Sequence, residues 1–135
     1  MHTMIVLLPY FSEYAQIVHS STCGDVYSFG VVLLEMIIGK RPTDSMFDGG
    51  LSINSFVERN FPDQVFHIID THLQEECKGF IKATSATENK VYQCVLSLVQ
   101  VALACTRPFP RDGMNMREVA INLHAIRKSY VAATK

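Results

Sequence analysis

The sequence predicts an all-α fold, and three observations carry that prediction. Apolar residues recur at helical spacing in several segments, and those segments begin at capping residues and end at Gly or Pro. No segment shows the strict apolar–polar alternation of a half-buried strand. Apolar residues make up 48% of the 135-residue chain and charged residues 19%, which is typical of a globular domain or of a piece of one.

The first predicted helix covers residues 22–38 and is apolar almost all round, as expected of a helix enclosed by others. Thr22 and Asp25 have the spacing of a capping box, in which each side chain bonds to the backbone N–H of the other residue. Gly39 suits the left-handed position that follows a helix, and Pro42 prevents continuation. At about 1.5 Å per residue the helix is roughly 25 Å long, too short to span a bilayer.

For the middle of the chain, the sequence predicts two short helices and two loops. Residues 43–50 form the first loop, residues 52–59 a short helix that ends before Pro62, and residues 64–69 a second short apolar helix. Residues 74–90 are polar, small and charged, and we expect a mobile surface loop there.

Two longer helices complete the prediction. The first spans about residues 88–105. Its polar residues Gln93, Ser97 and Gln100 form one narrow polar stripe, which we expect to face solvent. The second begins with Asn115 as N-cap and Glu118 three residues later, and it runs to about Lys128. Its apolar face is formed by Met116, Val119, Ala120, Leu123 and Ile126.

Charge and cysteine content narrow the function classes. The chain has 12 basic and 13 acidic side chains and a net charge of −1, which offers no electrostatic case for binding nucleic acid or an anionic membrane surface. Its four cysteines show no CxxC pair, so we expect reduced structural thiols, with disulfides as the minority alternative. The spacing of His67, Asp70 and His72 is poor for a metal site, and His19 beside Ser20 and Ser21 lacks an orienting acid for hydrolase chemistry.

Several strings resemble the end of a protein kinase domain, most of all that of plant receptor-like serine/threonine kinases of the leucine-rich-repeat class. They are Glu13-Tyr14-Ala15, Gly24-Asp25-Val26-Tyr27-Ser28-Phe29-Gly30, Gly39-Lys40-Arg41-Pro42-Thr43-Asp44, Ala104-Cys105-Thr106 and Met114-Asn115-Met116-Arg117-Glu118-Val119. The resemblance implies a partial kinase C-lobe over residues 13–130, without the N-lobe sheet. Residues 1–12 are unmatched and 131–135 form a tail.

The resemblance implies structural rather than catalytic roles for the matched residues. The first predicted helix would run through the middle of the C-lobe, and Asp25 at its start would bond to the backbone of the catalytic loop. The alternative is that Asp25 only caps its own helix. Gly30 closes the matched string in the same helix.

A second matched carboxylate, Glu13, has lost its family partner. That Glu pairs in the family with an Arg whose position is Gly113 here, and Arg111 lies two residues earlier. Either Arg111 replaces the partner or the Glu13 region is solvated and loose. We hypothesise the second, because a buried carboxylate without its partner costs on the order of 3–5 kcal/mol.

The residues that phosphoryl transfer needs are not in the sequence. The family binds ATP and Mg²⁺ through a glycine-rich loop, a strand Lys, an HRD loop and a DFG motif, and none of these occurs here. We therefore expect no catalytic, cofactor-binding or metal-binding residue in this chain, and no activity of the chain alone.

Two function classes remain open. One is a kinase-family fragment of the cytoplasm, as the resemblance implies, since full-length members lie on the cytosolic side of the plasma membrane. The other is a non-catalytic interaction module or decoy that binds a kinase, a receptor or a chaperone through exposed apolar C-lobe helices. We expect no nucleic-acid partner, and no signal peptide or membrane span, because the run Met4–Leu8 is short and ends at Pro9.

Overall fold

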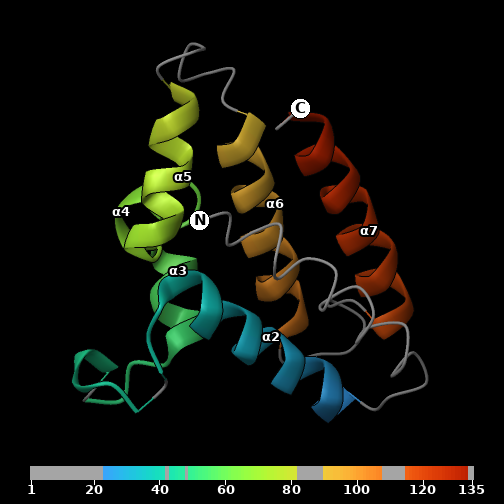
Figure 1. Ribbon diagram of the computed structural model, residues 1–135. Helices are drawn as coiled ribbons and strands as arrows, with labels where there is room; N and C mark the ends of the chain where they lie inside the picture. Colours follow the sequence, from blue (N-terminus) through green and yellow to red (C-terminus); the bar gives the residue numbers. More distant parts are fainter. Residues whose placement is uncertain (1–22, 42, 48, 82–89, 108–114, 134–135) are drawn as a thin grey trace.

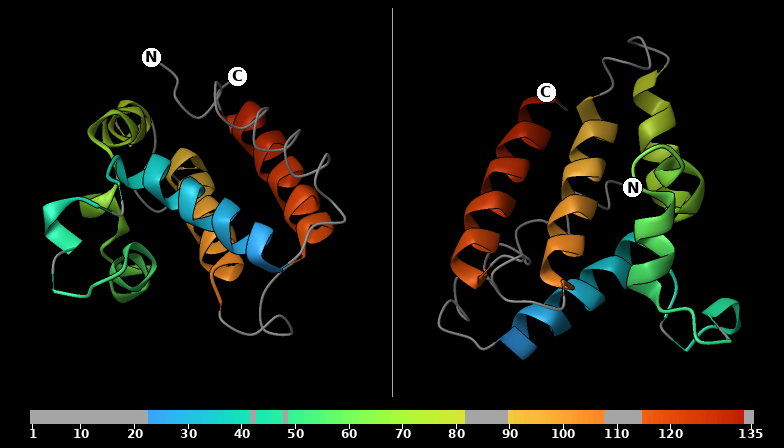
Figure 2. Two further views of the ribbon diagram at one scale, coloured as in Figure 1. Left: turned by 90° about the horizontal axis from the view of Figure 1, so that it is seen from below. Right: turned by 180° about the vertical axis from the view of Figure 1, so that it is seen from behind.

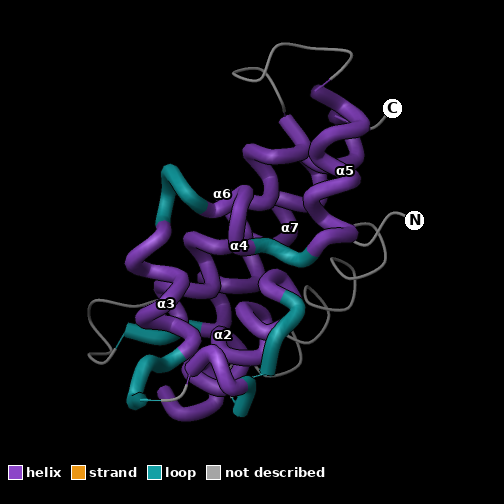
Figure 3. Tube along the Cα trace, turned by 90° about the vertical axis from the view of Figure 1, so that its left-hand side faces the viewer, coloured by secondary structure: helices purple, strands orange, loops and turns teal. Residues whose placement is uncertain are grey.

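The computed structural model describes residues 23–41, 43–47, 49–81, 90–107 and 115–133, and these ranges contain helices and turns but no strand (Figure 3). The all-α prediction is therefore confirmed for the described residues. In chain order the elements are α2 (Cys23–Ile38), the 3-10 helix η1 (Ser45–Phe47), α3 (Ile53–Asn60), α4 (Val65–Ile68), α5 (Thr71–Ile81), α6 (Lys90–Cys105) and α7 (Met116–Ala133).

Helix α6 lies at the centre of the arrangement. α7 runs beside it on one side, and α3, α4 and α5 lie on the other (Figure 1). α2 crosses the C-terminal end of α6 (Figure 2). Buried apolar side chains of the six described α-helices and of η1 form one core, and several of them, such as Leu33, Val57, Leu98 and Leu123, are almost inaccessible to solvent.

Helix α2 ends at the residue that the sequence predicts. Gly39 has φ of 75°, and the backbone N–H groups of Gly39 and Lys40 both donate to the carbonyl of Glu35, at 2.8 and 3.2 Å. The expectation that α2 is enclosed on every side is wrong for this chain, because Val32 is 48% exposed and Met36 39% exposed. These two residues lie four apart, so α2 has an open apolar stripe opposite its buried face.

The end of α2 is joined to the start of α5 through Asp70. The Asp70 N–H donates to the Ile37 carbonyl at 2.8 Å, and its carboxylate accepts a hydrogen bond from the His72 N–H at 3.2 Å. A Cβ atom at Gly39 would lie 2.6 Å from Oδ1 of Asp70. Glycine at this position therefore satisfies both the left-handed backbone and the close approach of the carboxylate.

Alanine at Gly39 should consequently destabilise the fold. We expect Gly39→Ala to lower the free energy of unfolding by about 1–2 kcal/mol, the usual cost of a left-handed L-residue, and somewhat more if Asp70 has to move. Urea denaturation measures the change. An Asp70→Ala background removes the contacts with Oδ1 and Cγ and leaves only the one with Cβ at 3.2 Å, so the same substitution should cost less there. An equal cost in both backgrounds would contradict the contact with the carboxylate.

The two short helices form as predicted. The Ser55 N–H donates to Oγ of Ser52 at 3.2 Å, which makes Ser52 the N-cap of α3. Ile53 and Val57, four residues apart, bury the same face of α3. α4 follows over Val65–Ile68, inside the predicted range 64–69.

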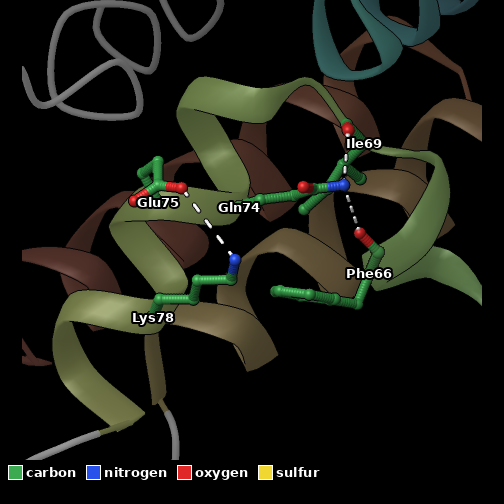
Figure 4. Close-up of polar contacts among 5 residues, drawn as sticks. All are labelled: Phe66, Ile69, Gln74, Glu75 and Lys78. Carbon is green, nitrogen blue, oxygen red and sulfur yellow. Dashed lines mark hydrogen bonds and ion pairs between the residues drawn. The ribbon is translucent and has the colours of Figure 1, made fainter.

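The surface loop predicted for residues 74–90 is wrong over residues 74–81, which belong to α5. Asp70 caps this helix at its start, and Leu73 and Cys77 lie four residues apart on its buried face. The Gln74 side chain donates to the carbonyls of Phe66 and Ile69, at 2.9 and 3.2 Å, and so ties α5 to the end of α4 (Figure 4). Residues 82–89 lie outside the described residues.

The start of α7 and the end of α6 match the prediction, and the end of α7 differs. The predicted first residues of α6, 88 and 89, lie outside the described residues, and the described helix begins at Lys90. The Glu118 N–H donates to Oδ1 of Asn115 at 2.8 Å, and the Asn115 N–H donates back to Glu118 Oε1 at 3.4 Å, so the capping box forms. α7 continues past Lys128 to Ala133, because Tyr130 extends the buried face four residues beyond Ile126. α6 ends at Cys105 as predicted.

Candidate functional site

The structure describes two of the four residues that the sequence singles out. Asp25 and Gly30 both belong to α2. Glu13 and Arg111 lie outside the described residues, as does Gly113, so their proposed pairing stays a prediction. Asp25 occupies the first turn of α2 and its side chain is exposed, and a carboxylate there is favourable beside the positive end of the helix dipole.

Gly30 is the point where α2 meets α6. A Cβ atom at this position would lie 2.6 Å from Cβ of Cys105, 2.9 Å from the carbonyl oxygen of Ala102 and 2.9 Å from Cγ2 of Thr106. The Ala102 oxygen belongs to the α6 backbone and Cys105 Cβ is attached directly to it, so neither atom can rotate away. The two helix backbones therefore approach as closely as they do only because residue 30 has no side chain.

The predicted polar stripe of α6 forms one wall of a groove. Gln93, Ser97 and Gln100 are exposed, and they face Asn122 and Ser129 of α7 across a groove of about 680 Å³. Asn122 donates from Nδ2 to the Glu118 carbonyl at 2.8 Å. The groove is lined by polar and small side chains together with the aliphatic residues Val101 and Ile126, and Lys90 is the charged residue along it.

A buried polar contact that the sequence did not reveal joins α5 to α7. The Tyr130 hydroxyl donates to Oε2 of Glu76 at 3.2 Å, and both residues are buried. Burial, and then the neighbouring Glu76 carboxylate, raises the pKa of Tyr130 above its usual value. Because Glu76 lies in a segment that reads as loop, its partner 54 residues later could not be predicted.

The three cysteines whose side chains the structure describes behave as structural thiols. Cys77, Cys94 and Cys105 are reduced and buried, as the sequence predicts. Burial raises the pKa of Cys105 to about 12, and burial followed by Glu76 and Cys94 raises the pKa of Cys77 to about 12. Thiols in such surroundings are poor nucleophiles and poor metal ligands at neutral pH.

Alkaline pH should therefore destabilise the folded chain, partly because these thiols lose their protons. The folded state holds the proton of Cys105 more tightly than the unfolded state, so this stabilisation is complete below pH 9.0 and is lost between pH 9.0 and about 12. Each such thiol contributes a slope of up to about 1.4 kcal/mol per pH unit. Urea midpoints measured from pH 8 to 11 should fall less steeply for Cys105→Ala, and an unchanged slope would contradict this assignment.

Among the residues that the structure describes, no group of His, Cys, Asp and Glu is placed to hold a metal ion. His67 and His72 belong to α4 and α5, and Asp70 between them is occupied with capping α5. In the same part of the chain, no helix combines the length and the apolar character needed to cross a bilayer.

Comparison with known proteins gives relatives over most of the chain. It is 31% identical over 111 residues to the receptor kinase-like protein Xa21 of Oryza sativa subsp. japonica, which covers 82% of this chain and 11% of that protein. It is 30% identical over 121 residues to the LRR receptor-like serine/threonine-protein kinase EFR of Arabidopsis thaliana, covering 90% and 10%. No family model matches the chain.

A third relative matches a shorter part of the chain at a higher sequence identity. Protein BRASSINOSTEROID INSENSITIVE 1 of Arabidopsis thaliana is 44% identical over 64 residues, which cover 47% of this chain and 5% of that protein. The chain thus spans about a tenth, or less, of the length of these relatives. Over the range of the matches, the chain belongs to the plant leucine-rich-repeat receptor-like serine/threonine protein kinases.

Proposed function

We propose that this chain is the distal part of the C-lobe of a receptor-like kinase, with residues 13–130 as the partial domain, and that it does not transfer phosphate by itself. The family activity is ATP-dependent protein phosphorylation, with Mg²⁺ as the metal. The motifs that bind ATP and Mg²⁺ in this family are not among residues 1–135. In this proposal the chain supplies structural support to a catalytic part on the cytosolic side of a membrane.

The observation that carries the proposal is the two-sided character of α2. One side packs against α6 at Gly30, within the string Gly24–Gly30 on which the family resemblance rests. The other side carries the exposed residues Val32 and Met36. A helix that is packed on one side and apolar on the other is suited to lie between two parts of a larger domain.

A chimaera tests the proposal. The 111 matching residues of Xa21 would be replaced by the aligned part of this chain within the Xa21 kinase domain, and autophosphorylation measured with labelled ATP. We expect the chimaera to phosphorylate itself and the 135-residue chain alone to show no activity and no ATP binding. A Met36→Asp chimaera that is folded but inactive would support the role of the open face of α2; activity of the chain alone would contradict the proposal.

The interaction module or decoy is the second candidate, and the same exposed Val32 and Met36 favour it. A decoy would compete for the surface that normally contacts this face. Adding the chain to the intact Xa21 kinase domain should then lower its autophosphorylation, and Met36→Asp should abolish the inhibition. No inhibition at a large molar excess of the chain would exclude this function for that kinase.

A further inference from the structure

Helix α7 carries a stripe of exposed side chains that no other described helix covers. Arg117, Ile121, His124, Lys128 and Val131 follow one another at spacings of four, three, four and three residues, and all five are exposed. Such spacing places them on one face of the helix. The two aliphatic members are among the most exposed large apolar residues of the described chain, at 62% for Ile121 and 44% for Val131. We call these five residues, with Arg127 beside them, the α7 stripe.

The charge of the α7 stripe is of one sign. Arg117, Arg127 and Lys128 are cations, and none of them forms an ion pair with a described carboxylate. Glu118, the acidic residue of α7, bonds to the Asn115 N–H in the capping box and lies one residue from Arg117, away from the stripe. The stripe therefore presents basic charge that nothing described in the chain neutralises.

The net charge of the whole chain conceals this local excess. Glu58 of α3, Asp63, and Glu75 of α5 are exposed acids, and α3 and α5 lie on the opposite side of α6 from α7 (Figure 1). A net charge of −1 is thus the sum of separated regions of opposite sign. The electrostatic argument against an anionic surface, which rests on that sum, does not apply to α7 taken alone.

We propose that the α7 stripe is a contact surface for an anionic phospholipid membrane, on which α7 lies parallel to the bilayer plane. An 18-residue helix is roughly 27 Å long, and its outer face is convex, which suits a broad surface better than a peptide that needs a groove. Cations reach the headgroup phosphates while Ile121 and Val131 enter the headgroup layer between them. This inference rests on α7 and does not depend on the proposed kinase role.

The interleaved aliphatic residues favour lipid over other polyanions. A nucleic acid rewards cations that contact its phosphates, but it offers no apolar layer for Ile121 and Val131. An acidic protein would likewise need a matching apolar site to cover the two side chains. A membrane surface supplies both the charge and the apolar boundary in one layer.

Flotation of the full 135-residue chain with vesicles tests the proposal. We expect binding to vesicles of phosphatidylserine and phosphatidylcholine, little binding to phosphatidylcholine alone, and loss of binding as NaCl rises toward 0.5 M. Each cation near an anionic surface contributes roughly fivefold to the partition constant. Arg117→Gln, Arg127→Gln and Lys128→Gln together should therefore weaken binding about a hundredfold.

A matched control separates the stripe from net charge. Lys40→Gln, Arg41→Gln and Arg59→Gln make the same change in net charge on exposed residues of the other part of the molecule, and we expect less than a threefold effect, as for distant screened charges. Ile121→Ser with Val131→Ser should weaken vesicle binding severalfold by removing apolar contact. Circular dichroism verifies that each variant keeps its helices.

The outcomes that overturn the proposal are distinct from each other. No binding to anionic vesicles, or an equal loss in the control triple variant, rejects the α7 stripe as a lipid contact. Tighter binding to polyglutamate or to duplex DNA than to vesicles assigns the stripe to an acidic protein or to nucleic acid instead. Because the assay contains only chain and vesicles, none of these results depends on whether the Xa21 chimaera is active.

Discussion

Leucine at Gly30 should cost the fold about 3 kcal/mol or more, the upper end of the usual range for overpacking a closed interior. The first atom of the new side chain would already lie 2.6 Å from Cys105 Cβ and 2.9 Å from the Ala102 carbonyl oxygen. α2 and α6 would have to separate, and with them the largest part of the core. A gain in helix propensity of up to about 1 kcal/mol offsets only part of this cost.

Urea denaturation with Ser28→Leu as control measures this effect. Ser28 lies on the exposed side of the same helix, two residues from Gly30, so the same leucine should change stability by about 0.5 kcal/mol or less there. Gly30→Ala should fall between the two, since a single methyl group meets the same α6 atoms. If leucine at both positions had equal effects, the close crossing of α2 and α6 would be contradicted.

Removing the side chain of Tyr130 should destabilise the chain about as strongly, by about 3–5 kcal/mol for Tyr130→Ala. The ring is 1% exposed and fills the space between the end of α7 and its neighbours. Its hydroxyl is also a donor to the buried Glu76 carboxylate. The variant therefore leaves a cavity and takes a hydrogen bond away from a buried charge-bearing group.

Tyr130→Phe separates the two parts of that effect. It keeps the ring and removes only the hydroxyl, so we expect a loss of about 1–3 kcal/mol. In a Glu76→Leu background, where the acceptor is gone, the same substitution should cost much less, and a double-mutant cycle from thermal melts gives the coupling. Additive effects of the two substitutions would mean that the Tyr130–Glu76 hydrogen bond contributes nothing to stability.

The ends of most helices could be predicted because they depend on local chemistry. Gly39, Ser52 and Asn115 act within three or four residues of themselves, and each performs the capping role that its residue type predicts. The all-α class follows in the same way from apolar spacing. Long apolar stretches such as α6 leave few alternatives to a buried helix.

Helix α5 could not be predicted from the sequence, because the contacts that stabilise it involve residues distant in sequence. Its apolar residues are few and stand among Glu75, Glu76 and Lys78, so the local pattern resembles a solvated loop. Leu73 and Cys77 become core residues only against α6, and Glu76 becomes buried only beneath Tyr130. Charged residues are good helix formers, and tertiary contacts decide such cases.

The candidate site also combines features that the sequence predicts with features that depend on the tertiary fold. The sequence marks Gly30 as part of a family string, but the reason for a glycine there is visible only once α6 lies against it. The predicted polar stripe of α6 forms, yet its position opposite α7 required the fold. The α7 stripe, by contrast, can be read from the spacing of Arg117, Ile121 and Lys128, although the net charge of the chain had argued against an anionic partner surface.

The central claim is that these helices close a common core around α2 and α6 without further polypeptide, and a thermal melt of the full chain tests it most directly. Circular dichroism would follow helix content in the far ultraviolet and tyrosine packing in the near ultraviolet, after size-exclusion chromatography. We predict a monomer whose two signals are lost together in one cooperative transition. Aggregation, or helical signal without any near-ultraviolet signal, would show that the core does not close and would contradict the account.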